Sequence, residues 1–115
     1  MNNSDLKLYI AVHDAFPDYM VPTLVAHSVL AAHMNWYSII DIGNLYLNWL
    51  THSFKKVVVR VNQKEFDKIS QMEYIHLGHE NKTVDGKPSC VVVCPREEYP
   101  NVLKYAKMWK PKETE

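Results

Sequence analysis

The chain lacks the features of secreted, membrane-spanning or strongly charged proteins. Its 115 residues carry 13 basic and 13 acidic side chains, so the formal net charge is zero. This argues against a dedicated nucleic-acid binder, because such proteins rely on many Lys and Arg contacts to phosphate. No apolar run is long enough to span a membrane, and no secretory signal is recognisable. We therefore expect a cytoplasmic protein without a membrane partner.

Cysteine is also scarce. Only Cys90 and Cys94 occur, within a run that is typical of a strand. Four residues of strand span about 13 Å, whereas a disulfide requires Cα atoms within about 7 Å. The two thiols should therefore remain unpaired in the core of a reduced protein. The histidines do not show the spacing of three or four metal ligands, so we predict no metal and no cofactor.

The residues that are present indicate one ordinary globular domain. Apolar residues make up 47% of the chain and charged residues 23%, and no repeat or linker interrupts it. We expect a single domain over residues 1–115, with frayed ends at 1–5 and 111–115.

The hydrophobic pattern predicts strands at residues 6–12, 55–61, 74–79 and 89–94, and helices at 22–34, 39–54, 63–72 and 100–109. Asn62 and Glu65 have the spacing of a capping box at the start of the third helix. The predicted order is β-α-α-β-α-β-β-α. Helices interleaved with valine-rich strands favour a three-layer α/β sandwich, in which a mixed four-stranded sheet is flanked by helices.

Three stretches of the chain, in this order of elements, resemble the type-2 peptidyl-tRNA hydrolases. Residues 8–12 and 24–31 look like the first strand of that family and its helix containing Lys-x-Ala-Ala-Gln. Residues 56–61 are similar to its second strand. Residues 81–83, followed by 91–95, look like its Asp-Ala-Gly-Arg-Thr loop, last strand and proline. The resemblance covers most of the chain and implies the same fold.

The groups credited with catalysis in that family are largely replaced. Its members hydrolyse the ester between a peptide and the tRNA ribose, a reaction that needs an activated water or hydroxyl and stabilisation of the oxyanion. Thr23 stands at the position of the lysine, His27 at the glutamine and His79 at the loop aspartate. The rest of the loop has Asn81 for the glycine, Lys82 for the arginine, and a retained Thr83.

The resemblance leaves three hypotheses open, and with them the question of whether the protein is an enzyme. In the first, a nucleotide-like small molecule or a tRNA end binds without hydrolysis in the inherited pocket. That pocket would be lined by Thr23, His27, His79, Asn81, Lys82 and Thr83. In the second, His27, His79 and Thr83 supply the base and nucleophile of an active hydrolase. In the third, the domain binds another protein.

Two structural expectations accompany these hypotheses. A homodimer is expected, because members of the family are often dimers. The loop from His79 to Gly86 can also be a simple polar hairpin turn, since it contains Asp85-Gly86.

Overall fold

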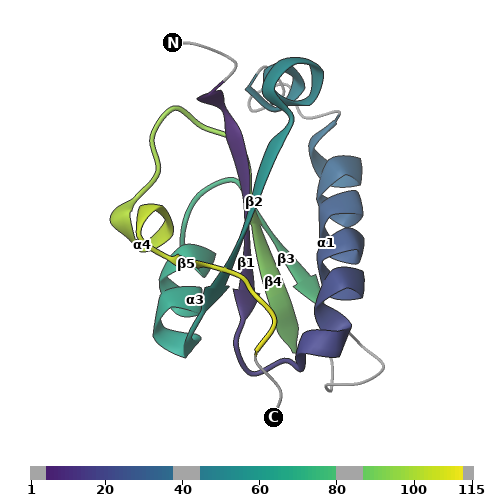
Figure 1. The fold of residues 1–115 in the computed structure, drawn as a ribbon. Coiled ribbons are helices and arrows are strands. Elements are labelled where there is room, and N and C mark those ends of the chain that lie inside the picture. Colours follow the sequence, from purple (N-terminus) through teal and green to yellow (C-terminus); the bar gives the residue numbers. More distant parts are fainter. Residues whose placement is uncertain (1–4, 38–44, 80–86, 113–115) are drawn as a thin grey trace.

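A computed structural model describes residues 5–37, 45–79 and 87–112 of the chain, and Figure 1 shows its fold. The strands are β1 (Lys7–His13), β2 (Lys55–Val61), β3 (Ile75–His79), β4 (Pro88–Val93) and β5 (Lys107–Met108). The helical elements are the 3-10 turn η2 (Asp18–Met20), α1 (Val21–Trp36), the π-helix η3 (Trp49–Ser53), α3 (Gln63–Ser70) and α4 (Asn101–Lys104). Residues 45–48, just before η3, are also helical.

The five described strands form one mixed sheet in the order β3-β4-β1-β2-β5. The pair β1 and β2 is parallel, and the three other pairs are antiparallel. The α/β class is as predicted, but the predicted count of four strands is wrong.

The central strand β1 is buried on both faces, because its side chains alternate between two cores. Leu8, Ile10 and Val12 point into one core, which also contains Leu24 of α1 and Trp49 of η3. Tyr9 and Ala11 point into the other core, with Phe66 of α3 and Leu103 of α4. Figure 1 accordingly shows α1 on one side of the sheet and α3 with α4 on the other. The result is a three-layer arrangement.

The start of α3 confirms the predicted capping box. The side-chain oxygen of Asn62 accepts a hydrogen bond from the backbone N–H of Glu65 at 2.9 Å, and the Glu65 carboxylate accepts one from the Asn62 N–H, also at 2.9 Å. Both bonds satisfy donors that a helix start would otherwise leave unpaired. Phe66 and Ile69 then bury the inner side of α3.

The predicted helix at residues 100–109 is wrong beyond its first turn. The helix α4 ends at Lys104, and Lys107–Met108 forms the fifth strand, β5, along β2. The backbone N–H of Trp109 also donates to Val58 O at 2.8 Å. Pairing covers the outer edge of β2, which would otherwise expose unpaired backbone groups. Pro111 also disfavours a helical conformation of Lys110, which weakens the preference of residues 105–110 for a helix.

The two cysteines are buried and unpaired, as predicted. Burial raises the pKa of both thiols, and raises that of Cys94 to about 12. Because the thiolate is the reactive form, we expect no alkylation of the native protein at mildly alkaline pH and two alkylated thiols in denaturant. Rapid labelling of the native chain would contradict this burial.

The same raised pKa gives a direction to the stability of the protein at alkaline pH. A thiol in the unfolded chain ionises near its ordinary pKa of 9.0, whereas folded Cys94 keeps its proton to about 12. The unfolded chain therefore loses protons first as the pH rises. Stability should be complete below pH 9 and should fall between pH 9 and 12.

Candidate functional site

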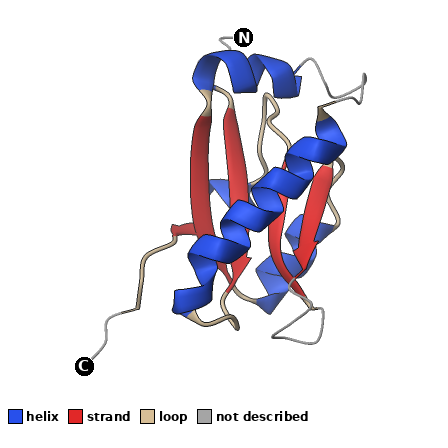
Figure 2. Ribbon diagram, turned by 90° about the vertical axis from the view of Figure 1, so that its right-hand side faces the viewer, coloured by secondary structure: helices blue, strands red, loops and turns tan. Residues whose placement is uncertain are grey.

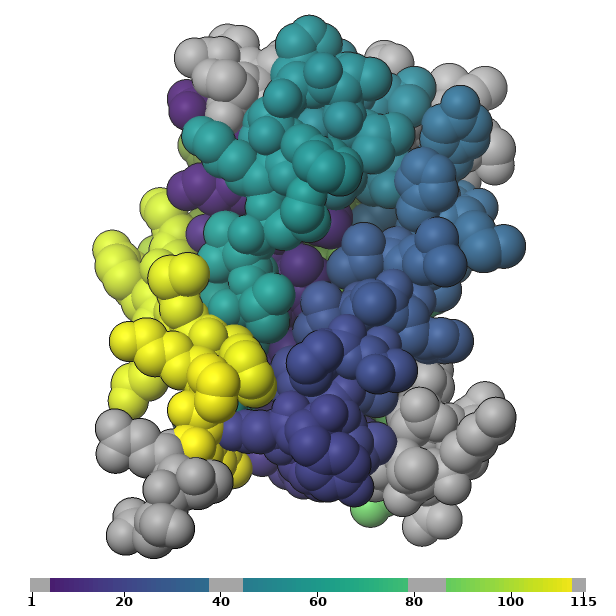
Figure 3. All heavy atoms as spheres, turned by 45° about the vertical axis from the view of Figure 1, so that its right-hand side comes forward, coloured from purple at the N-terminus to yellow at the C-terminus, as the bar shows by residue number. Residues whose placement is uncertain are grey.

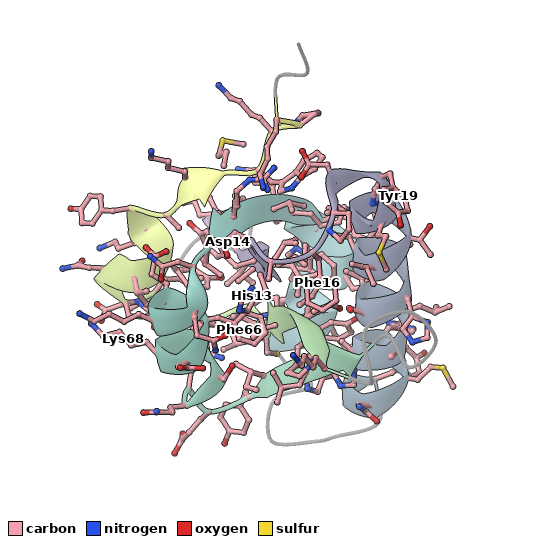
Figure 4. The ribbon with its side chains drawn as sticks, turned by 90° about the horizontal axis from the view of Figure 1, so that it is seen from below. His13, Asp14, Phe16, Tyr19, Phe66 and Lys68 are labelled. Atoms are coloured by element: carbon pink, nitrogen blue, oxygen red, sulfur yellow. The ribbon has the colours of Figure 1, made fainter. Side chains whose placement is uncertain are left out.

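A cavity of about 580 Å³ opens at the end of the sheet where the parallel strands β1 and β2 have their carboxyl ends. Ligands of open α/β sheets commonly bind at this position. Figure 4 views the molecule from this end. The cavity is lined by residues of the β1 end, of α3, of β3 and of the start of β4, namely His13, Ala15, Phe16, Gln63, Phe66, Asp67, Ser70, Leu77, Lys87 and Pro88.

The parallel pairing of β1 and β2 determines which residues meet at this cavity. His13 is in register with Val61, and the backbone N–H of Asp14 donates to Val61 O at 2.9 Å. Asn62 then begins α3 at the same end of the sheet, so Gln63, its first residue, lies next to His13. Two residues that are 50 positions apart in sequence are thus brought into contact.

The polar side of the cavity is a continuous chain of hydrogen bonds. The backbone N–H of Ala15 donates to Nδ1 of His13 at 3.0 Å. A neutral His13 must then carry its proton on Nε2, which donates to Oε1 of Gln63 at 2.7 Å. The Gln63 amide in turn donates to Oδ1 of Asp67 at 2.7 Å. These hydrogen bonds together fix the orientations of the His13, Gln63 and Asp67 side chains.

The floor of the cavity is apolar and aromatic. The ring of His13 lies 5.0 Å from that of Phe66 and 6.2 Å from that of Phe16, measured between centroids. Figure 4 shows His13 between these two phenylalanines. Leu77 adds an aliphatic side chain from β3. At the rim, Lys87 and Asp67 are exposed and carry opposite charges.

A second cleft, of about 360 Å³, lies on the other side of the β1 and β2 ends, towards β5. Arg60, which lines this cleft, forms an ion pair with Asp18 Oδ1 at 3.1 Å and donates a hydrogen bond to Lys110 O at 2.5 Å. Asp18 also accepts from the backbone N–H of Lys112 at 2.5 Å. That bond and the Arg60 guanidinium hold the pKa of the Asp18 carboxyl below its ordinary value. These contacts fix residues 110–112 onto the domain, so we interpret this cleft as structural.

Of the residues implied by the family resemblance, Thr23 and His27 do not line the 580 Å³ cavity. Thr23 and His27 are exposed on α1, and neither lines either cleft. His79 is the last residue of β3. Asn81, Lys82 and Thr83 lie outside the described residues. The helix α1 does approach the end of β3, because Ser28 packs against Gly78.

The residues that form the hydrogen-bonded chain were not among the candidates drawn from the sequence. A signal for them was present, since His13 and Asp14 directly follow a buried strand and Gln63 directly follows a predicted helix cap. Polar residues at the carboxyl ends of parallel strands are common ligand contacts. Applying that rule also requires the parallel pairing of β1 and β2, which the sequence analysis did not predict.

Comparison with known proteins finds no matching family and no curated protein of significantly similar sequence. Within the described residues, no helix has the length and apolar character needed to cross a membrane. In the same part of the chain, no three His, Cys, Asp or Glu side chains are grouped so that they could hold a metal ion.

Proposed function

We propose that this protein binds a nucleotide-like ligand or an RNA end at the carboxyl end of β1, without hydrolysing it. The observation that carries the proposal is the hydrogen-bonded chain from His13 through Gln63 to Asp67 along a cavity of about 580 Å³. That volume is within the roughly 300–1,000 Å³ of small-molecule sites. An apolar floor with a few oriented polar groups is also typical of such sites.

The chemistry of the rim suits a nucleotide. Gln63 has a second amide hydrogen and Asp67 a second carboxylate oxygen beyond those used in the chain. Together they offer a donor next to an acceptor, the combination that reads the edge of a base. Lys87 supplies a cation for a phosphate. The family resemblance also expects ligand contacts from Asn81, Lys82 and Thr83, which lie outside the described residues.

The state of His13 supports binding rather than hydrolysis. Its Nδ1 lone pair accepts the Ala15 N–H and its Nε2 proton is donated to Gln63, so neither ring nitrogen is free to take a proton from water. A general base must reach the proton that it removes. His27 makes no hydrogen bond to any described side chain that would orient it as a base, and it lies on the outer side of α1.

A calorimetric screen of mono-, di- and cyclic nucleotides and deacylated tRNA tests this proposal. We expect at least one to bind, and Gln63→Ala to weaken that binding about tenfold or more, roughly 1.4 kcal/mol. Gln71→Ala is the matched control, because Gln71 is an exposed glutamine at the far end of α3. Failure of every ligand to bind the wild-type protein would refute the proposal, as would equal binding by the two variants.

One further assay distinguishes an active hydrolase from a protein that binds its ligand without hydrolysing it. Purified protein is incubated with a peptidyl-tRNA analogue beside an authentic type-2 enzyme, and we expect no turnover. Turnover that disappears in His27→Ala or His79→Ala would instead establish histidine chemistry. That outcome would overturn the non-hydrolytic part of the proposal.

A further inference from the structure

An apolar groove of about 310 Å³ lies between α1 and η3. Figure 3 shows these two segments side by side. Figure 2 faces α1, and no described element lies over that helix. Leu30 of this groove is 63% exposed and Phe54 is 52% exposed. A bound apolar chain would therefore remove large apolar side chains from water. The apolar walls are formed by Ala26, Val29 and Leu30 of α1, by Trp49 and Leu50 of η3, and by Phe54.

The polar side chains that line the groove leave one fixed charge available to a ligand. His33 and Tyr46 are hydrogen-bonded to each other, with 2.7 Å between Nδ1 and the hydroxyl oxygen. The indole N–H of Trp49 donates to Lys55 O at 2.7 Å. The remaining polar side chain among the described lining residues is that of Lys56, at the start of β2, and none of those residues is acidic. In its described part the groove thus combines apolar walls with one positive charge.

A left-handed turn at Phe54 explains why Lys56 reaches the groove. Phe54 has φ 54° and ψ 17°, a conformation that is costly for a bulky residue. Its backbone N–H donates to Trp49 O at 2.7 Å and closes η3, and β2 begins at the next residue. The Lys56 ammonium consequently lies 3.1 Å from the centroid of the Phe54 ring and 5.5 Å from that of Trp49.

The Lys56 ammonium has donors to spare and no counter-anion within the described residues. It donates to Phe54 O at 2.7 Å, and an ammonium has three N–H donors, so two remain. Neither of the ion pairs formed by described residues includes Lys56. Burial lowers the pKa of Lys56 below its ordinary value of 10.5, because the charged form loses part of its hydration. A carboxylate beside the ammonium would offset that loss.

We infer that this groove binds a free medium-chain fatty acid, with the alkyl chain between α1 and η3 and the carboxylate paired with Lys56. An alkyl chain needs no hydrogen-bond partner, so apolar walls suit it. The positioned ammonium suits a carboxylate, which accepts charge-assisted hydrogen bonds. The volume of about 310 Å³ lies at the lower end of the roughly 300–1,000 Å³ of small-molecule sites, which favours a slender ligand.

Other ligands match this combination of walls and charge less well. An extended peptide would bring backbone N–H and C=O groups that apolar walls cannot pair. A bilayer surface is held by several cations, whereas Lys56 is the one lysine among the described residues that line the groove. A neutral ligand would leave the Lys56 ammonium without an anion. The 580 Å³ cavity shares no lining residue with this groove, so the inference does not depend on the proposed nucleotide site.

Calorimetric titration of the full chain with octanoate and with octanol tests the role of the charge. We expect octanoate to bind and octanol to bind about tenfold more weakly, because the alcohol has no charge. Lys56→Gln should weaken octanoate binding by about the same factor and leave octanol unchanged. Lys55→Gln is the matched control, since Lys55 is exposed and does not line the groove.

Three results of this titration would overturn the inference. They are no binding of octanoate to the wild-type protein, equal affinities for octanoate and octanol, and equal losses in the two lysine variants. Sedimentation with phosphatidylglycerol vesicles by a protein that does not bind octanoate would assign the groove to a membrane surface instead.

Filling the groove tests where the alkyl chain lies. Ala26 is an exposed residue of the α1 wall, so Ala26→Trp should place an indole in the groove without disturbing the core. We expect this variant to keep its circular dichroism and to lose at least tenfold in affinity for both octanoate and octanol. Thr23→Trp is the control, because Thr23 is exposed on the same helix but does not line the groove. Undiminished octanoate binding by Ala26→Trp would contradict a site between α1 and η3.

Discussion

Replacing Trp49 with alanine should lower the free energy of unfolding by about 3–5 kcal/mol. Trp49 is 1% exposed and lies in the core beneath α1. Its ring centroid is 5.4 Å from that of Tyr46 and 5.2 Å from that of Phe54, and its indole N–H donates to Lys55 O at 2.7 Å. The substitution would remove a large apolar side chain, leave a cavity, and deprive the Lys55 carbonyl of its donor.

Urea denaturation followed by circular dichroism measures this loss. Trp49→Phe is the graded control, because it keeps one aromatic ring but removes the N–H together with part of the indole, and we expect a smaller loss of about 1–3 kcal/mol. A loss within about 0.5 kcal/mol of zero for Trp49→Ala, as at ordinary surface positions, would show that η3 is not anchored through this ring.

Gly78→Ala should destabilise the protein by about 1–3 kcal/mol or more, through overpacking between β3 and α1. A Cβ atom at Gly78 would lie 1.9 Å from Oγ and 2.7 Å from Cβ of Ser28. Rotation of the Ser28 hydroxyl would relieve only the first clash. The helix would therefore have to move away from the strand, which would disturb a close-packed contact.

A double-mutant cycle identifies the clash as the cause. Ser28→Gly removes both offending atoms, so Gly78→Ala should cost much less in that background than in the wild type. Ser28→Ala keeps the Cβ atom and should restore less. Equal costs of Gly78→Ala in all three backgrounds, measured by urea denaturation, would assign the loss to another origin.

The sequence was most informative where local patterns decide the structure. The valine-rich strand at Lys55–Val61 was predicted with its observed bounds, and the Asn62 and Glu65 capping box with its observed hydrogen bonds. Both depend on residues that are neighbours along the chain. The prediction of a helix over residues 100–109 was wrong. Val102, Ala106 and Trp109 do have helical spacing, but pairing of Lys107–Met108 with the edge of β2 outweighs that local preference.

The candidate cavity was less predictable, because its residues come from distant parts of the chain. His13, Gln63 and Lys87 meet only once the order of the strands is known. The family resemblance directed attention to α1 and to the loop after β3 instead. The structure places Thr23 and His27 on the outer side of α1, where both are exposed. The loop contacts at Asn81, Lys82 and Thr83 stay a prediction.

The most direct test of the proposed function is a titration of isotope-labelled protein with adenosine monophosphate, followed by the amide resonances in nuclear magnetic resonance spectra. The amides of Ala15, Gln63, Asp67 and Lys87, which surround the cavity, should shift with a common saturation curve. The amides of Thr23, His27 and Leu30, which are exposed on α1, should not move with that curve. No shift at saturating nucleotide, or shifts confined to α1 or β5, would contradict a nucleotide site at the carboxyl end of β1.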